Sequence, residues 1–336
     1  MTTAEATGDE LGAVTAATKA GDESAFGALA ERYRRELQVH CYRMLGSYED
    51  SEDLTQETFL RAWRKRASFR GTSSFRAWLY RIATNACLDV LKRRPRNAGA
   101  SKREAFEVPW LQPYPDRLLE EVPAPDAEPE VAIVSKETIE LAFIVAIQQL
   151  TPNQRAVLIL RDVLGWTAKD AAELLETSVA SVNSALQRAR AGLQQYLPQR
   201  RLDWEAGSDP SREERELLQR YVDATEQADQ EAFIELLRED ARFAMPPEPE
   251  VYVGNETMVR AWAKGGAFDQ ETFGHMRGVL TRANLQPAVG CYVKRPGSAE
   301  YTPFALDVLR IEEGQVAEII TFPPDLFPAL GLPPSL

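Results

Sequence analysis

The chain has 336 residues, 44% of them hydrophobic and 27% charged, and a formal net charge of −12. This composition is ordinary for a globular protein, and the length predicts two or three domains rather than one core. No run of about 18 apolar residues occurs, and the first residues, MTTAEATGDELGAV, lack a basic segment followed by an apolar one. We therefore expect no membrane segment, no secretory signal and a cytoplasmic protein.

Cysteine and histidine are too few and too scattered for a disulfide framework or a metal site. The three cysteines are Cys41, Cys87 and Cys291, and the two histidines are His40 and His275. No Cys/His group has metal-ligand spacing. We expect buried thiols, no metal and no cofactor.

The acidic charge is unevenly distributed. Residues 1–100 carry a net charge of +3 and residues 138–200 carry +1, whereas residues 101–137 carry −5 and residues 201–336 carry −11. This asymmetry is compatible with an N-terminal half that binds a polyanion and an acidic C-terminal half.

Residues 19–97 form the first predicted domain, which is helical throughout. Apolar side chains recur at helical spacing from Ala25, from about Asp50 and from Phe75. Ser74 is the expected N-cap of the third helix. The loop before this helix, SFRGTSS, is rich in Gly, Ser and Thr.

The stretch RKRASFRGTSSFRAWLYRIATNACLDVLKRR, Arg64 to Arg94, holds nine basic residues and one acid. Basic groups bind phosphates and aromatic rings stack on unpaired bases. Phe75 and Trp78 belong to the apolar stripe, which leaves both core packing and base contact open for them. Tyr80 and Phe69 fall outside the stripe, so we expect them to be exposed and to contact bases.

Residues 98–137 are rich in proline and acids, which favours extended backbone over a packed core, and we interpret them as a linker. Residues 138–198 form the second helical domain. Within it, Thr167 and Ser178 are predicted N-caps of two helices separated by a tight turn. This pattern is typical of a helix-turn-helix.

The second of these helices presents a polar face that could read base edges in a major groove. The alternative is a helical hairpin with a solvated polar face. The candidate DNA contacts are Ser181, Asn183, Ser184, Gln187 and Arg188.

After a second linker, residues 199–212, the pattern changes. Two helices are predicted over 213–228 and 230–238, followed by strand-like runs and one helix at 257–263. We predict that residues 213–336 form an α+β domain with an antiparallel sheet, because the strands follow one another through short Gly/Pro turns.

The two helical domains resemble regions 2 and 4 of the extracytoplasmic-function sigma factors of bacterial RNA polymerase. The resemblance lies in YEDSEDLTQETFLRAWRKRASFRGTSSFRAWLYRIATNACLDVLKRR and in LTPNQRAVLILRDVLGWTAKDAAELLETSVASVNSALQRARAGL. It implies that the helix-turn-helix reads the −35 promoter element and that the polymerase core and promoter DNA are the partners.

The resemblance also implies residue roles. The helix DLTQETFLR would dock on the β′ clamp helices through Asp53, Gln56, Glu57 and Arg61, and the polymerase β flap is a further expected partner. The following segment would melt and read the −10 element through Phe69, Arg70, Tyr80, Arg81, Thr84 and Asn85. One departure is that Asn183 and Ala185 stand where many family members have basic residues. The acidic linker resembles linkers that thread the polymerase cleft.

The C-terminal domain resembles the SnoaL-like, nuclear-transport-factor-like cone fold, and the linker motif VPWLQPYPD resembles that of sigma factors carrying such an extension. The resemblance implies regulation of sigma activity by this domain and an intramolecular contact with the sigma domains. Cone-fold enzymes use a His/Asp pair, and no carboxylate is placed beside His275 by the sequence, so we expect no catalysis. A ligand pocket would be lined by Met245, Trp262, His275 and Phe304, with Phe273 beside them.

Two alternatives come from other classes of protein. One is a ligand-responsive helix-turn-helix regulator that acts without being a polymerase subunit, which would have no need of the segment from Arg64 to Arg94. The other is a cone-fold enzyme with DNA-binding appendages, which would have to show turnover.

Overall fold

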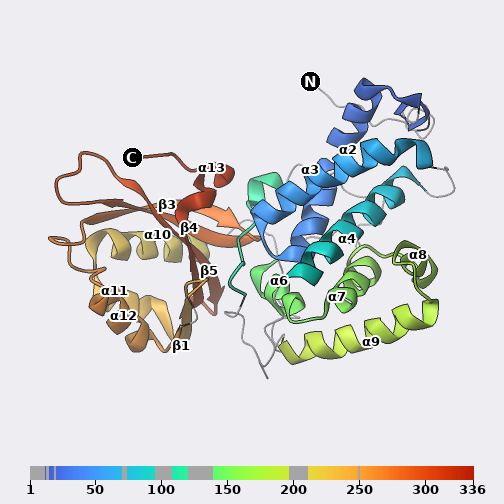
Figure 1. Cartoon of the computed structure of the whole chain (residues 1–336). Coiled ribbons are helices and arrows are strands. Elements are labelled where there is room, and N and C mark those ends of the chain that lie inside the picture. Colours follow the sequence, from blue (N-terminus) through green and yellow to red (C-terminus); the bar gives the residue numbers. More distant parts are fainter. Residues whose placement is uncertain are drawn as a thin grey trace. The chain divides into compact units, whose positions relative to one another are not determined.

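The computed structural model describes residues 12, 15–18, 20–69, 74–94, 108–119, 139–196, 211–248 and 250–336. These residues form two compact units (Figure 1). The first unit contains the helical residues up to Arg93 and those between Ala146 and Tyr196; the second contains residues 101–120, 139–145 and 199–336.

Three helices, α2 (Glu23–Leu45), α3 (Tyr48–Lys65) and α4 (Phe75–Arg93), form the first helical domain. A 3-10 turn, Arg66–Ser68, follows α3. The predicted N-cap of α4 is confirmed, since the Ser74 hydroxyl accepts a hydrogen bond from the backbone N–H of Ala77 at 3.1 Å. Helix α2 ends at Gly46, whose φ of 72° suits glycine at this position.

The second helical domain contains α6 (Leu141–Gln148), α7 (Pro152–Leu158), the π-helical turn Ile159–Val163, α8 (Ala168–Leu174) and α9 (Val179–Tyr196). The Thr167 and Ser178 hydroxyls accept hydrogen bonds from the backbone N–H groups of Asp170 and Ser181, both at 3.1 Å. Both predicted caps are therefore confirmed.

A buried arginine joins the two helical domains. The Arg155 guanidinium of α7 donates to the carbonyl oxygens of Ile147 at 2.9 Å and of Gln148 at 2.9 Å, and also to the Met44 carbonyl near the end of α2. The Gln148 side-chain amide donates to the Arg43 carbonyl at 3.3 Å. Because carbonyls at a helix C-terminus carry partial negative charge, this is a favourable place for a buried cation.

The second unit contains a six-stranded sheet in the order β2-β1-β6-β5-β4-β3. Its strands are β1 (Leu237–Ala244), β2 (Val251–Val253), β3 (His275–Ala283), β4 (Gln286–Lys294), β5 (Thr302–Glu312) and β6 (Gln315–Phe322). The predicted antiparallel arrangement holds for every neighbouring pair except β1 and β6, which are parallel.

Helices α10 (Arg212–Gln227), α11 (Gln230–Leu236) and α12 (Asn255–Lys264) cover one face of this sheet (Figure 1). Helix α11 ends at Leu236, two residues before the predicted Arg238, and β1 begins at Leu237. The opposite face carries a 3-10 turn, Pro324–Leu326, the short helix α13 (Phe327–Leu330) and the C-terminal residues. Gly290 of β4 lets this tail approach, because a Cβ there would lie 2.6 Å from a methyl of Leu332.

Part of the predicted linker is packed, contrary to the expectation that it stays outside a core. The described segment 108–119 buries Val108, Leu111, Tyr114 and Leu118, and it contains a 3-10 turn, Asp116–Leu118. The content of proline and acids favours extended backbone, yet these four apolar side chains are buried. The other linker residues, 98–107 and 120–137, lie outside the described residues.

No helix in the described part of the chain is long and apolar enough to cross a membrane.

Candidate nucleic-acid interface

Helix α4 carries most of the residues predicted to read the −10 element. Asn85 is exposed and Arg81 is half-buried, so both side chains can be reached from solvent. Thr84 is fully buried and Arg70 lies outside the described residues. The prediction that Tyr80 and Phe69 are exposed is wrong, because their exposed fractions are 1% and 7%. Their base-contact role stays a prediction that would need a rearrangement.

Two contacts explain why Tyr80 is buried although it lies off the apolar stripe. Its hydroxyl donates to Glu36 of α2 at 2.8 Å, and its ring lies 5.5 Å from that of Trp166, which precedes α8. Arg81 beside it forms an ion pair with Glu173 of α8 at 3.4 Å. The second helical domain therefore covers one end of the proposed −10 reading face.

Phe69, Phe75 and Trp78 form a compact trio with ring centroids 5.4–5.6 Å apart. Phe69 and Phe75 are buried and Trp78 is half-buried. Core packing, one of the two roles left open, therefore describes Phe75 here, and Trp78 keeps part of its ring accessible.

A buried histidine supports the same helix. The His40 Nε2 and the Thr84 hydroxyl are 2.9 Å apart, and the His40 ring packs against Tyr80. Burial, with smaller contributions from Arg43 and Arg76, lowers the pKa of His40 to about 3. His40 is thus neutral at physiological pH, which suits an interior position.

Helices α8 and α9 form the predicted helix-turn-helix. Glu176, in the turn, takes a positive φ of 52°, and the backbone N–H of Thr177 donates to the Ala172 carbonyl at 2.9 Å. Val182, Leu186 and Ala189 of α9 are buried, whereas Val179, in the first turn of the helix, is 43% exposed.

The candidate −35 contacts lie on the outward side of α9. Four of them are exposed and Ser184 is half-buried; the exposed ones are Ser181, Asn183, Gln187 and Arg188. The Arg188 guanidinium donates to the Ser184 hydroxyl at 2.7 Å. Ala185, at the position of departure from the family pattern, is buried, so a charged side chain would be unfavourable at this position.

The predicted polymerase-docking residues lie on α3. Asp53 and Gln56 are exposed, whereas Glu57 and Arg61 are half-buried and form an ion pair at 2.7 Å. Gln56 also lines a cavity of about 450 Å³ between α2 and α3, and the apolar side chains around this cavity are Phe26, Phe59, Leu60 and Trp63. Leu60 is 52% exposed. Only polar residues were predicted in the docking site; the sequence signal for its apolar part was a leucine, Leu60, among the polar docking residues of this helix.

The packed linker segment is hydrogen-bonded to the turn between β3 and β4. The backbone N–H of Tyr114 donates to the Asn284 side-chain oxygen at 2.7 Å, and the backbone N–H of Asn284 donates to the Tyr114 carbonyl at 2.9 Å. Asp116 accepts from the backbone N–H of Leu285 at 2.8 Å and pairs with Arg282 at 3.2 Å. We call residues 108–118 together with this turn the linker clasp.

Further hydrogen bonds join the linker clasp to α13 and to the start of the second helical domain. Arg117 donates to the carbonyls of Ala329 at 2.5 Å and Pro328 at 3.0 Å in α13. On the other side of the linker, the Asn284 amide donates to the Ile139 carbonyl, and the backbone N–H of Leu141 donates to the Gln286 side chain at 3.3 Å. The middle of the linker and the residues that directly follow it are thus bound to one hairpin.

The candidate ligand pocket of the C-terminal domain is not assembled as predicted. Trp262 packs against Phe233 and Phe243, whereas Phe304 packs against Phe273. His275 and Met245 are exposed. No ring contact within the described part of the domain joins these two aromatic groups.

A carboxylate that the sequence analysis did not identify lies on the helix-covered face of the sheet. Asp307 of β5 accepts from the Tyr221 hydroxyl at 3.0 Å and from the Cys291 thiol at 3.4 Å, and it is 2.5 Å from the Thr321 hydroxyl. Burial raises the pKa of Asp307, and these three hydrogen bonds oppose the shift. An aspartate inside the apolar run FALDVL was the available signal.

Comparisons with known proteins agree with this architecture. The model of sigma-70 region 2 matches residues 29–97 and that of sigma-70 region 4 matches residues 140–193. The ECF RNA polymerase sigma factor SigG of Mycobacterium tuberculosis is 42% identical over 325 residues, which cover 93% of this chain and 85% of that protein. The RNA polymerase sigma-H factor of Pseudomonas aeruginosa is 30% identical over 53% of this chain and 88% of its own length.

Among solved structures, the extracytoplasmic function sigma factor SigJ of Mycobacterium tuberculosis matches 92% of this chain and 99% of its own, with a TM-score of 0.57 and 21% identity. This likeness extends over all domains, including the C-terminal sheet. The predicted fold class, two helical domains followed by an α+β domain, is therefore confirmed.

Proposed function

Since the chain belongs to the extracytoplasmic-function sigma factors of bacterial RNA polymerase, we propose residue roles for its two helical domains and a regulatory role for its C-terminal domain. Sigma factors of this family bind the polymerase core, direct it to promoters and help to open them. They act by binding rather than by catalysis.

The proposed polymerase contact is the exposed face of α3 with the adjoining cavity. Asp53, Gln56, Glu57 and Arg61 supply polar contacts, while Leu60 and Trp63 supply an apolar anchor. A mixed surface of this kind suits a helical partner, because apolar anchors contribute most of the affinity and polar groups set the orientation.

The proposed −10 contacts are Arg81 and Asn85, with Phe69, Arg70, Tyr80 and Thr84 as further members of the predicted set. Support for Asn85 is its exposure on α4, beside basic side chains that attract phosphates. Trp166 would have to leave Tyr80, and Glu173 would have to leave Arg81, before bases could approach these two residues.

The proposed −35 contacts on α9 are supported by their shared outward face. Asn, Gln and Arg can each make paired hydrogen bonds to base edges in the major groove. Replacing Gln187 or Arg188 with Ala should cost about 1–3 kcal/mol and relax preference at one −35 position. Competition binding with single-base promoter variants would measure this, and an unaltered preference would exclude groove contact.

The linker clasp is the observation that carries the regulatory proposal. The middle of the linker, at Tyr114, and the residues that directly follow it, Ile139 and Leu141, are hydrogen-bonded to the β3–β4 hairpin of the C-terminal domain. We infer that the bound linker restrains the two sigma domains from taking up the spacing that a promoter requires, and that its release activates the protein. Transcription by polymerase core with the full chain and with a clasp variant, side by side, tests this inference.

A further inference from the structure

Three cations stand at one end of the β3–β4 hairpin, in the most acidic part of the chain. They are Arg277 of β3, Lys294 of β4 and Arg295 directly after it, and we call them the cationic cluster. Residues 201–336 contain 24 acids and 13 bases. Despite this excess, none of the three cations forms an ion pair with any residue that the structure describes; their recorded partners are aromatic rings and one carbonyl.

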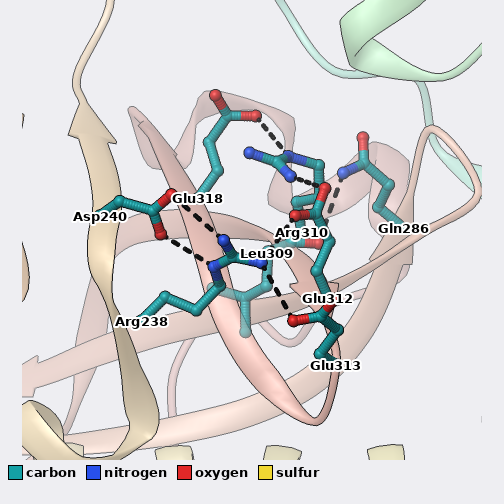
Figure 2. A network of polar contacts seen from close by, with 8 residues as sticks. All are labelled: Arg238, Asp240, Gln286, Leu309, Arg310, Glu312, Glu313 and Glu318. Atoms are coloured by element: carbon teal, nitrogen blue, oxygen red, sulfur yellow. Dashed lines mark hydrogen bonds and ion pairs between the residues drawn. The ribbon is translucent and has the colours of Figure 1, made fainter. Parts of the chain in front are cut away.

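Other strand arginines of the same domain are paired with acids. Arg238 pairs with Asp240 at 2.8 Å and with Glu312 at 3.2 Å, and Arg310 pairs with Glu318 at 3.1 Å. Figure 2 shows these ion pairs. Arg282 is likewise paired with Asp116. Where an arginine helps to hold this sheet together, a carboxylate accompanies it; the cationic cluster lacks such partners among the described residues.

Aromatic rings hold the cluster in place instead. The Arg277 guanidinium lies 4.8 Å and the Lys294 ammonium 5.8 Å from the ring centre of Tyr301. Arg295 lies 4.8 Å from the ring centre of Phe273 and donates to its carbonyl at 3.4 Å. Cation–π contacts position a charge without neutralising it, so a full positive charge remains available to a partner.

The strand register places two of the cations on one face. His275 pairs with Lys294, and Arg277 pairs with Tyr292, so these side chains project from the same side of the hairpin. The backbone before β3 is held close to β4 at Gly274, whose φ is 111° and where a Cβ would lie 2.3 Å from the Lys294 carbonyl oxygen. The backbone that carries the cationic cluster is therefore held in place by the pairing of β3 with β4.

The surroundings favour one kind of polyanion. Cations already lie against the rings of Tyr301 and Phe273, which makes these rings less available for stacking by unpaired bases. The outer edge of β3 is partly closed, because the backbone N–H of Gly278 donates to Glu226 of α10 at 3.3 Å, which hinders the addition of an acidic peptide as a further strand. A rigid group of unneutralised cations suits the phosphates of a double helix, because charge dominates the binding of the DNA backbone.

We propose that the cationic cluster contacts the phosphate backbone of duplex promoter DNA, as a third DNA-binding surface of the chain. The inference rests on the proposed sigma function. The acids elsewhere in the domain repel DNA, so they confine the contact to this hairpin end.

The test uses holoenzyme, assembled from polymerase core and the full chain, and a promoter fragment extended by duplex upstream of the −35 element. The variant carries R277Q, K294Q and R295Q. A matched control, R212Q, R215Q and R260Q, removes three exposed cations of the same domain that lie on helices. A second control, R277K, K294R and R295K, keeps the charge.

Each lost phosphate contact lowers the slope of log Kobs against log salt concentration by about 0.9. The cluster variant should therefore lose about 2–3 from this slope and bind about tenfold more weakly at 0.15 M salt, while both controls match the wild type. A slope of log Kobs against log salt concentration that equals the wild-type slope overturns the proposal. If the variant has this unchanged slope and also binds the polymerase core more weakly, the cluster would instead contact an acidic protein partner. Failure to form any holoenzyme would instead contradict the sigma function.

Discussion

Asn284 binds the backbone of Tyr114, 170 residues earlier in the chain, through two reciprocal hydrogen bonds of 2.7 and 2.9 Å. Because Asn284 also donates to the Ile139 carbonyl, a single side chain contacts the middle of the linker and the segment that directly follows it. The regulatory proposal depends on this residue more than on any other.

Replacing Asn284 with Gly should open the linker clasp. Asn284 has a φ of 55°, which glycine also adopts readily, so the turn should persist while the side-chain bonds are lost. Two hydrogen bonds at about 1 kcal/mol each predict faster amide exchange over residues 108–118 and about 3- to 10-fold more promoter-specific transcript. Glu313→Gly, at another positive-φ turn of the same sheet, is the control. Reduced transcription by N284G alone would mean that the clasp activates rather than restrains.

Replacing Leu60 with Asp should weaken binding of the polymerase core. The change puts a charge at the rim of the apolar cavity between α2 and α3, and a predicted loss of about 2–3 kcal/mol corresponds to roughly 30- to 150-fold in affinity. Fluorescence anisotropy of labelled protein with sigma-free core would measure it. Val253→Asp, an equally exposed apolar residue of the C-terminal domain, should have no effect. Equal core affinity of the L60D variant and the wild type would remove α3 from the interface.

Replacing Asn85 with Ala should impair promoter opening without affecting core binding. Asn85 is exposed on α4, so its loss should not disturb the fold, whereas Tyr80 is buried and its truncation would confuse the two effects. We expect the rate of opening, followed by 2-aminopurine fluorescence in the −10 element, to fall about 10-fold. Lys92→Ala, two turns further along α4, serves as the control. A parallel loss of core affinity in N85A would contradict the assigned role.

Acidification should destabilise the first helical domain through His40. Burial lowers its pKa from 6.5 to about 3. Between these two pH values His40 is therefore protonated in the unfolded state and neutral in the folded state. Stability is therefore complete above pH 6.5 and falls by up to about 1.4 kcal/mol per pH unit between pH 6.5 and 3. Amide exchange of α2 between pH 7 and 5, corrected for intrinsic rates, should show this loss in the wild type and in His275→Gln. It should be reduced in His40→Gln, and identical pH profiles for all three proteins would contradict a buried neutral His40.

Features that depend on local chemistry were predictable from the sequence. The caps at Ser74, Thr167 and Ser178 follow from side chains that bond to backbone three residues ahead, and the structure confirms all three. The helix-turn-helix follows from those caps and from apolar spacing. The polar face of α9 was predictable for the same reason, since packing on one side leaves the other exposed.

Features that depend on distant partners could not be predicted from the sequence. Tyr80 lies off the apolar stripe of its own helix, yet Glu36 and Trp166, from two other segments, enclose it. The packing of residues 108–118 depends on a turn some 170 residues later. The parallel pairing of β1 with β6 likewise requires knowledge of the whole sheet, because each strand alone is compatible with either direction.

The measurement that tests the account most directly is in vitro transcription with sigma-free polymerase core, the full chain and a library of promoter fragments. Core with the wild type should yield transcripts that start at defined positions downstream of −35 and −10 elements, and N284G should yield more of the same transcripts. Absence of any promoter-specific transcript from both proteins would contradict the central claim that this chain directs polymerase to promoters.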